Sequence, residues 1–331
     1  MSRLPRSLSI LLSAVIVLLA AYPFFGDVLF PNKHAFLMQK LTGIMIMAVM
    51  AMSLDLLVGV AGLVSMGHAA FFGLGGYMLA MLSPEYSAAN LWVVLPAALV
   101  VVAIASAMVG YLSIRTSGIY FIMVTLAFGQ MGFYFFNDSK VAGGSDGAYI
   151  MFKPAVEILG VSLLNLGDKR TLYYVGLGAL VGVYLLLRLL LASPFGRVVS
   201  AIGVNENRVR GLGFDPVAYK LLAFTIGGTI AGLAGFLAAI QYGFVNPATL
   251  SWHHSGEALV MVILGGMGTL FGPAIGAFVF ELAKMGFESV TEHWLLPMGM
   301  MIIGIVLLLP KGVGGLLLQL FSGRSKMEGG Q

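Results

Sequence analysis

Residues 52–73 read MSLDLLVGVAGLVSMGHAAFFG, an apolar segment that glycine interrupts at positions 59, 62, 67 and 73. It belongs to a chain of 331 residues, of which 59% are hydrophobic and only 10% are charged. Water-soluble globular proteins carry about 25% charged residues, so this composition excludes a fold that water surrounds on all sides. The sequence therefore predicts an integral membrane protein.

Apolar segments recur from one end of the chain to the other. Most have roughly the 20 residues that a helix needs to cross a hydrocarbon layer about 30 Å thick. None of the long segments alternates apolar and polar residues over about ten positions, as a barrel strand would. We expect an all-α, polytopic membrane protein in which residues 1–331 form a single transmembrane domain with about ten segments. The expected spans are 7–25, 36–58, 63–83, 91–113, 117–136, 171–192, 218–242, the half-length 255–267, 270–288 and 294–309.

The distribution of basic residues predicts which segments lie inside. With ten crossings, one side carries nine Arg or Lys residues and the other side carries five, which is the asymmetry expected between inner and outer segments. We therefore expect both termini and the loop 193–217 to be cytoplasmic, and the loop 137–170 to be external. The net charge of +4 fits basic inner loops and requires no nucleic acid as a partner. The inner residues are Arg3, Arg6, Arg115, Arg197, Arg208, Arg210, Lys311, Arg324 and Lys326, and the outer ones are Lys33, Lys140, Lys153, Lys169 and Arg170.

Motifs typical of enzymes are missing or stand in the wrong context. Residues 143–147 match G-x-S-x-G, but they follow an expected helix, whereas a nucleophilic serine of this kind follows a strand. Asp and Ser between glycines are typical of a turn, so an intramembrane hydrolase that uses Ser145 is the weaker interpretation. No G-x-x-x-x-G-K-[ST] phosphate loop occurs, so we expect no ATPase site in this chain. The external turn comprises Gly143, Gly144, Ser145, Asp146 and Gly147.

We also expect neither a metal nor another cofactor. The chain has no cysteine, which excludes disulfides and thiolate-bound zinc. His253, His254 and Glu257 place a histidine and a carboxylate one helical turn apart, but two ligands with no third one nearby do not make a metal site. A cap at the membrane interface is the preferred interpretation of these three residues.

Polar side chains inside apolar spans are the more informative candidates. A charge at this depth costs about 2.5–3.5 kcal/mol on insertion scales. Asp55 lies near the inner end of its span and can reach the interface, while Lys40 and Lys284 near outer ends can extend their ammonium groups to water. His68 has no basic neighbour in sequence, so it either hydrogen-bonds two helices together or lines a pathway. The other candidates are Gln130, Glu257 and Glu281.

Glycine clusters indicate breaks in two spans, one in each half of the chain. Transporters place such broken helices beside a central pathway, although close packing of helices also uses glycine. We expect the backbone to turn near Gly266 and Gly268 within the membrane region, enclosed by protein or by a cavity. The candidates for a pathway or a hinge are Asp55, Ser65, His68, Gly265, Gly266 and Gly268.

Five blocks of the sequence together resemble one family. The segment 52–73 resembles the first motif of the permease subunits of branched-chain amino acid ABC importers. The resemblance is to the longer of the two subunits. The other blocks follow in the family's order and cover most of residues 45–285. They are 118–128 (GIYFIMVTLAF), 143–147, SPFGR at 193–197 continuing to 219–224 (YKLLAF), and 264–273 (LGGMGTLFGP).

The resemblance implies one part of a larger importer in a bacterial inner membrane. Such importers pair two related permeases with two cytoplasmic ATPases and an external substrate-binding protein. They carry branched-chain amino acids or related small polar solutes such as urea, amides or aromatic acids. The loop 193–217 is similar to the segment whose short helix docks on the ATPase, although a charged residue often found near 203–204 in the family is missing. The coupling residues implied are Ala201, Glu206, Arg208 and Gly213, with Ile202 and Val209 giving the helix an apolar side.

An ion-coupled secondary transporter is the alternative. It would need a titratable or sodium-binding site inside the bundle, for which Asp55, Glu257 and Glu281 are the candidates. It would have no use for a docking loop. Uptake into proteoliposomes without ATPases would distinguish the two.

The expected topology can be tested with a single cysteine. The variant Ser145→Cys should react with a membrane-impermeant thiol reagent added from outside, because residues 137–170 lie opposite the basic inner segments. The natural chain has no cysteine, so all labelling reports on this position. Labelling from the inside alone would overturn the topology.

Overall fold

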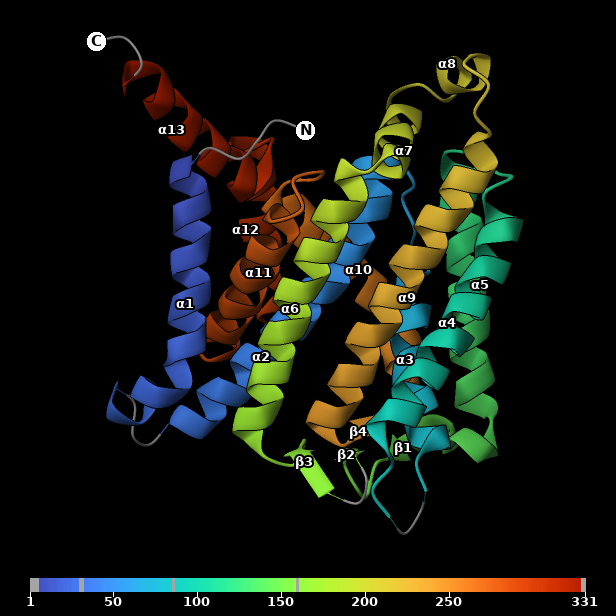
Figure 1. The fold of residues 1–331 in the computed structure, drawn as a ribbon, viewed down its shortest axis with the longest axis vertical. Coiled ribbons are helices and arrows are strands. Elements are labelled where there is room, and N and C mark those ends of the chain that lie inside the picture. The colour runs from blue at the N-terminus through green and yellow to red at the C-terminus, as the bar shows by residue number, and fades with distance from the viewer. Residues whose placement is uncertain (1–5, 30–32, 85–86, 159–160, 329–331) are drawn as a thin grey trace.

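The computed structural model describes residues 6–29, 33–84, 87–158 and 161–328. In this part of the chain, helices run back and forth between two ends of a bundle (Figure 1). Arg3, one of the basic residues counted above, lies outside the described residues. The helices that pass between the ends are α1 (Arg6–Leu29), α2 (His34–Asp55), α3 (His68–Leu82), α4 (Leu91–Ser113), α5 (Ile119–Asp138), α6 (Lys169–Ala192), α9 (Pro216–Tyr242), α10 (Trp252–Gly265), α11 (Gly272–Glu288) and α12 (Leu295–Leu308).

The remaining elements lie at the two ends of the bundle. The helix α1 begins, and α13 lies, at the end that carries α7 and α8, which we call the α7–α8 end (Figure 1). The strands lie at the opposite end, which we call the strand end. The α7–α8 end has α7 (Pro194–Val204), α8 (Glu206–Gly211) and α13 (Gly312–Glu328). The other short elements are η1 (Leu56–Ala61), η2 (Lys140–Ala142), η3 (Gly144–Asp146), η4 (Pro247–Leu250), β1 (Ala148–Tyr149), β2 (Ala155–Ile158), β3 (Val161–Asn165) and β4 (Phe244–Val245).

The all-α, polytopic fold expected from the sequence is confirmed. Each of the ten expected spans corresponds to a helix, with ends that differ by a few residues. In the described part of the chain, seven helical segments are long and apolar enough to cross a membrane. The helices α3, α10 and α11 are shorter, at 15, 14 and 17 residues, because the two glycine clusters interrupt the chain beside them.

Residues 137–170 contain short strands that the sequence did not predict. The strands β2 and β3 pair with each other, whereas β1 pairs with β4, which follows α9. The pairing of Ala148 with Val245 therefore ties this loop to the second half of the chain. The loop lies at the strand end, opposite the loop 193–217, as the ten-crossing count requires (Figure 1). Which end faces the cytoplasm stays a prediction.

Several helices begin at caps that the sequence supplies. The side chains of Asn90 and Asp168 accept hydrogen bonds from backbone N–H groups in the first turns of α4 and α6, at 3.0 and 3.3 Å. Asp215 does the same for α9, at 3.0 Å, and Pro216 follows it. Proline suits the first helical position because the N–H that it lacks would have no partner there.

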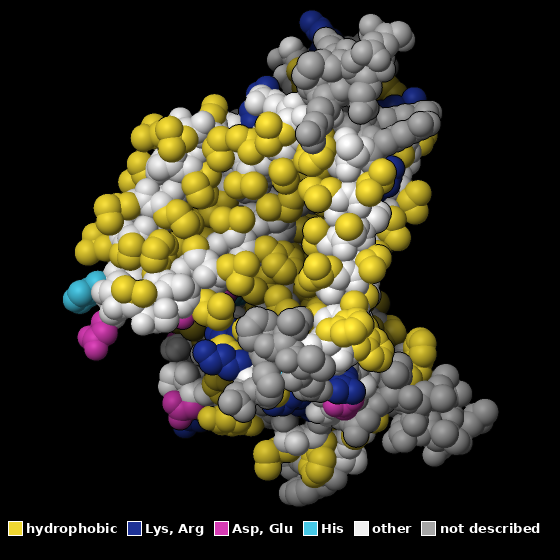
Figure 2. Space-filling view, turned by 90° about the vertical axis from the view of Figure 1, so that its left-hand side faces the viewer, with side chains coloured by type: hydrophobic (Ala, Val, Ile, Leu, Met, Phe, Trp, Pro, Cys, Tyr) yellow, Lys and Arg dark blue, Asp and Glu magenta, His cyan; other side chains and the backbone are white. Residues whose placement is uncertain are grey.

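The core of the bundle lies around α2 and α9. These two helices are buried over most of their length, whereas α1, α4, α5, α6 and α12 keep one apolar face exposed. Phe24, Met108, Met131 and Leu307 are examples of such exposed side chains. Figure 2 shows hydrophobic side chains over much of one flank, with Lys and Arg side chains toward its upper end and in its lower part. A lipid-covered surface has this apolar character.

Candidate functional site

The two glycine-interrupted segments lie against each other. After α2 ends, the chain makes the π-helical turn η1, reaches Gly62 with a positive φ of 72°, and stays irregular until α3 begins. The second break separates α10 from α11. A Cβ added to Gly268 would lie only 2.9 Å from the carbonyl oxygen of Gly59. We call residues 56–67 and 266–271 the glycine junction.

Asp55 joins the two breaks. Its carboxylate accepts hydrogen bonds from the backbone N–H groups of Gly268, at 2.7 Å, and Leu270, at 3.3 Å. The Asp55 side chain is fully buried, so it does not reach the membrane interface as the sequence had suggested. Thr269 adds two bonds within the turn, to the carbonyl of Gly266 at 2.8 Å and from the N–H of Gly272 at 3.1 Å.

These bonds supply what a broken helix lacks. Backbone groups inside a membrane must be hydrogen-bonded within the protein, because lipid offers no partner. Gly265 and Leu270 are buried, and Gly266 packs against the backbone at the start of α13. The expected break at Gly265, Gly266 and Gly268 is therefore present, and Gly265 and Gly266 are enclosed by protein.

Polar side chains stabilise the first break in the same way. The N–H of Met66 donates to the hydroxyl of Thr125, at 3.3 Å, and the N–H of Ala69 donates to the hydroxyl of Ser255, at 2.9 Å. The Nε2 atom of His68 is 2.8 Å from the hydroxyl oxygen of Ser53, and both residues are fully buried. This is the hydrogen bond between two helices that the sequence analysis considered for His68.

Ser65 lies in the same region and is also fully buried. Its hydroxyl has no hydrogen-bond partner among the described residues. Neither Ser65 nor His68 faces the pocket described below. As pathway candidates they therefore have no support from the cavity, although they lie at the glycine junction.

The short helix α7 touches the glycine junction directly. A Cβ on Gly203 would meet the carbonyl of Val60 and lie 3.3 Å from the carbonyl carbon of Ala61. No side chain therefore separates α7 from η1. A displacement of α7 acts first on η1, which adjoins Asp55, and through Asp55 on the turn between α10 and α11.

The coupling residues expected from the sequence differ in their surroundings. Ala201, Arg208 and Gly213 are exposed at the α7–α8 end. Glu206 instead forms an ion pair with Lys220 of α9 and a second one, at 3.2 Å, with Arg210. The expected apolar side chains, Ile202 and Val209, are buried against the rest of the chain. The exposed apolar side chains here are Val204, Leu212 and Phe214.

The turn at residues 143–147 does not have the surroundings of a nucleophilic serine. Ser145 is exposed within η3, and its hydroxyl is 3.4 Å from a carboxylate oxygen of Asp146. The elements before it are η2 and α5, not a strand. Gly143, Gly144 and Gly147 all have positive φ, as tight turns require. The segment is a turn at the strand end.

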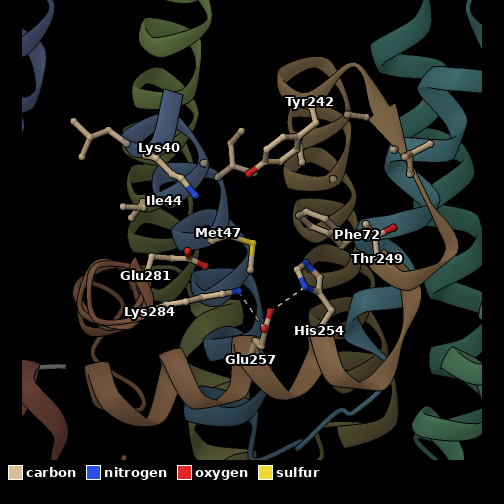
Figure 3. Close-up of a pocket in the computed structure, with 18 of the residues that line it drawn as sticks. Lys40, Ile44, Met47, Phe72, Tyr242, Thr249, His254, Glu257, Glu281 and Lys284 are labelled. Atoms are coloured by element: carbon tan, nitrogen blue, oxygen red, sulfur yellow. Dashed lines mark hydrogen bonds and ion pairs between the residues drawn. The ribbon is translucent and has the colours of Figure 1, made fainter. Parts of the chain in front are cut away.

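A polar pocket opens in the half of the bundle near the strand end. It has a volume of about 350 Å³ and lies between α2, α3, α9, α10 and α11 (Figure 3). Met47 and Phe72 contribute apolar walls. In one part of the pocket, Glu257 is 3.2 Å from Nδ1 of His254 and 3.7 Å from Nζ of Lys284. The other polar residues of the lining are Lys40, Tyr242, Thr249, Glu281 and Glu288.

Sequence reasoning found some of these residues and missed others. Glu257 and Glu281 were candidates for an ion site and do share this pocket, whereas Asp55 lies at the glycine junction. Lys40 and Lys284 were expected to extend toward water, but they line the pocket and their side chains lie toward it (Figure 3). The spacing of these residues in the sequence could have indicated that they lie together, because residues three positions apart share a helix face. His254 with Glu257, and Glu281 with Lys284, are such pairs.

Broken helices that meet inside an apolar bundle, with a polar pocket in the other half of that bundle, are typical of membrane transport proteins. The chain belongs to the family described as the permease component of branched-chain amino acid transport systems, whose profile matches residues 36–310.

Individual relatives agree with this assignment. The high-affinity branched-chain amino acid transport system permease protein LivM of Salmonella typhimurium is 29% identical, over 96% of this chain and 78% of that protein. LivM of Escherichia coli is also 29% identical, over 91% of this chain and 74% of its own length. The autoinducer 2 import system permease protein LsrC of Klebsiella pneumoniae is 37% identical, over 37% of this chain and 38% of its own. No solved structure matches the chain.

Removing the charge of Asp55 should weaken the glycine junction. In Asp55→Asn, one of the two backbone N–H groups loses its acceptor, and a hydrogen bond to a charged group contributes about 1.5–3 kcal/mol. We expect a lower midpoint of thermal unfolding in detergent and a lower transport rate. Asp138→Asn, which changes an exposed carboxylate at the end of α5, is the control and should change neither quantity. Equal stability of both variants would contradict the assigned role.

Valine at Gly268 should also disrupt the glycine junction. Gly268 has a φ of 75°, a region that costs other residues about 1–2 kcal/mol, and its Cβ would crowd the backbone of Gly59. Valine at Gly266, with a φ of 101°, should act similarly. The control is Gly304→Val in α12, where an added Cβ meets open space. The yield of folded protein and the uptake rate are the measurements, and a Gly268→Val variant that matches the control would refute the prediction.

Proposed function

We propose that this chain is the membrane-spanning permease subunit of an ABC importer in a bacterial inner membrane. Its substrate is a branched-chain amino acid or a related small polar solute, in keeping with the names of its relatives. Partner ATPases drive transport, since the chain has no phosphate loop of its own. A second, related permease and an external substrate-binding protein complete the importer. Residues 1–331 act as one transmembrane domain.

The orientation follows from charge. We place the α7–α8 end and both termini in the cytoplasm, and the strand end with residues 137–170 outside. The pocket then lies in the outer half of the membrane, on the side from which an importer receives its substrate. The turn at residues 143–147 lies at the outer mouth, where a substrate-binding protein can contact it.

The observation that carries the proposal is the contact between Gly203 and Val60. It places α7, which lies at the cytoplasmic end, directly on the glycine junction. The helices α10 and α11 continue from this junction toward the pocket, where α10 contributes Glu257 and α11 contributes Glu281. When the ATPases close on ATP, they displace α7, and the displacement reaches the pocket through the junction and these two helices.

The surface that docks on the ATPase is formed by exposed apolar side chains with Arg208 beside them. Val204 is 87% exposed and Leu212 is 71% exposed, which is unusual for apolar residues outside the lipid-covered part of a protein. Ala201 and Gly213 lie at the same end. Glu206 stays a proposed coupling residue, and its ion pair with Lys220 joins α8 to the start of α9.

An ion-coupled secondary transporter remains the second candidate because Glu257 and Glu281 share the pocket. Titratable groups inside a membrane often bind the coupling ion. An ion-coupled transporter has no partner ATPase on which α7 and α8 would dock. Substrate uptake by the chain alone, in proteoliposomes with an ion gradient and no ATPase, would establish it and exclude the ABC importer.

Charged substitutions in the docking surface should uncouple the importer. The double variant Val204→Asp with Leu212→Asp places two charges where an apolar contact is expected, and losing such a central contact costs about 2 kcal/mol or more. We expect less copurified ATPase and little ATP-dependent uptake, with normal membrane insertion. Met151→Asp, an exposed apolar residue in the strand-end loop, is the matched control and should retain its ATPases. Normal copurification and normal uptake by the double variant would show that the ATPase docks on another part of the chain.

A further inference from the structure

We propose that residues 139–150, which we call the outer strap, control access to the pocket from the strand end. While β1 is paired with β4, the outer strap holds Phe244 and Val245 in place in the pocket wall. When the pairing opens, this wall moves and the pocket admits its ligand. The inference rests on the proposed transport function and adds a control of access to the same pocket.

The outer strap is joined to the pocket wall through its backbone. Its strand β1 pairs antiparallel with β4 at the strand end, with Tyr149 opposite Phe244 (Figure 1). The rings of these two residues lie 4.8 Å apart, centre to centre. Phe244 and Val245 of β4 line the pocket, and so does Thr249 in the segment that follows. A movement of the outer strap therefore reaches the pocket through β4.

The attachment of the outer strap is small and separate from the main core. Each of the two paired strands has only two residues. The rings of Tyr77 and Phe136 stack beneath the strap, with their centres 4.1 Å apart. A segment held by few backbone bonds and little buried apolar surface opens locally at a low free energy. In the described part of the chain, the buried cluster here comprises Tyr77, Phe136, Ala142, Val245 and Leu250.

Glycines let the two strands lie close to the bundle and to each other. A Cβ added to Gly76 of α3 would lie only 3.1 Å from a methyl group of Val245. Gly147 precedes β1 with a φ of 77°, and Gly243 precedes β4 with a φ of 66°, a region that glycine adopts without strain. A Cβ on Gly147 would collide with the carbonyl oxygen of Val245. Any side chain at Gly147 therefore pushes β1 away from β4.

One polar group beneath the outer strap favours opening. Tyr77 is fully buried, and its hydroxyl has no hydrogen-bond partner among the described residues. A buried hydroxyl without a partner is unfavourable, because it has lost its hydrogen bonds to water. Water reaches this hydroxyl when the outer strap opens. Hydration of Tyr77 thus offsets part of the free energy that opening requires.

The exposed turn at residues 143–147 gives an external partner a place to act on the outer strap. Ser145 in this turn is exposed. Gly147 is the last residue of the turn, and Ala148 is the first residue of β1. A binding protein that contacts the turn therefore acts first on the pairing of β1 with β4. Delivery of the ligand and opening of the pocket are then coupled.

A disulfide between the two strands tests the proposal in the complete importer. The N–H of Ile150 donates to the carbonyl of Gly243, at 2.9 Å, so Tyr149 and Phe244 are the neighbouring non-hydrogen-bonded pair. The Cα atoms of such a pair are about 4.5 Å apart, which suits a disulfide. Oxidised Tyr149→Cys with Phe244→Cys should lose ATP-dependent uptake of L-leucine, and a reducing agent should restore it. Each single variant, oxidised in the same way, should keep its uptake, because the natural chain has no cysteine.

Labelling of a cysteine in the pocket tests the proposal without any partner. Met47→Cys gives a single thiol in the pocket wall. The full-length variant, in lipid nanodiscs, is labelled with a small, charged methanethiosulfonate reagent. Adding Gly147→Ala should speed labelling at least about fivefold, because labelling follows the population in which the outer strap is open. The matched control is Gly144→Ala, which has a similar φ of 60° but an added Cβ 3.5 Å from its nearest neighbour, and it should leave the rate unchanged.

The opposing results are distinct. Normal uptake after the disulfide has formed, as shown by the loss of free thiols, would overturn the proposal. Equal labelling rates with Gly147→Ala and Gly144→Ala would overturn it as well. If Gly147→Ala does not fold, the disulfide decides. Failure of the proposed function appears separately, as a lack of ATP-dependent uptake by the importer with the natural chain, and the labelling rates then still decide on the outer strap.

Discussion

The carboxylate of Asp55 holds together the two places where helices of this bundle break. A break inside a membrane exposes backbone N–H groups that lipid cannot satisfy, and the two oxygens of Asp55 accept from two of them, on Gly268 and Leu270. Thr125, Ser255 and Thr269 serve other N–H groups in the same way. Several of the few polar side chains in this apolar chain therefore hydrogen-bond the backbone at its breaks, and Asp55, Thr125 and Ser255 are buried together with it.

In the proposed mechanism, this arrangement separates the part that moves from the part that meets the substrate. The glycine junction lies near the α7–α8 end, where α7 packs on η1, and the polar pocket lies nearer the strand end. The helices α10 and α11 reach from one to the other. In the proposed mechanism, these two short helices tilt as units about the junction without breaking their own hydrogen bonds.

Hydropathy and glycine spacing were enough to predict the spans and the breaks, because both are properties of local sequence. The bond between Asp55 and Gly268 joins residues 213 positions apart, and no local pattern indicates it. Hydropathy also does not give the rotation of a helix, so Lys40 and Lys284 were assigned to water although they line the pocket. Ile202 and Val209 were correctly seen as an apolar face, but the sequence could not tell whether that face packs inside the chain or against a partner.

The contact of Gly203 with Val60 has a thermodynamic consequence. Linkage is reciprocal, so if the position of α7 changes the affinity of the pocket for its ligand, the ligand must bias the position of α7 by the same free energy. Two backbones that touch without a side chain between them have little compliance to absorb that bias. In the proposed importer, ligand bound in the pocket therefore shifts the position of α7 at the other side of the membrane, along the same path through which a displacement of α7 acts on the pocket.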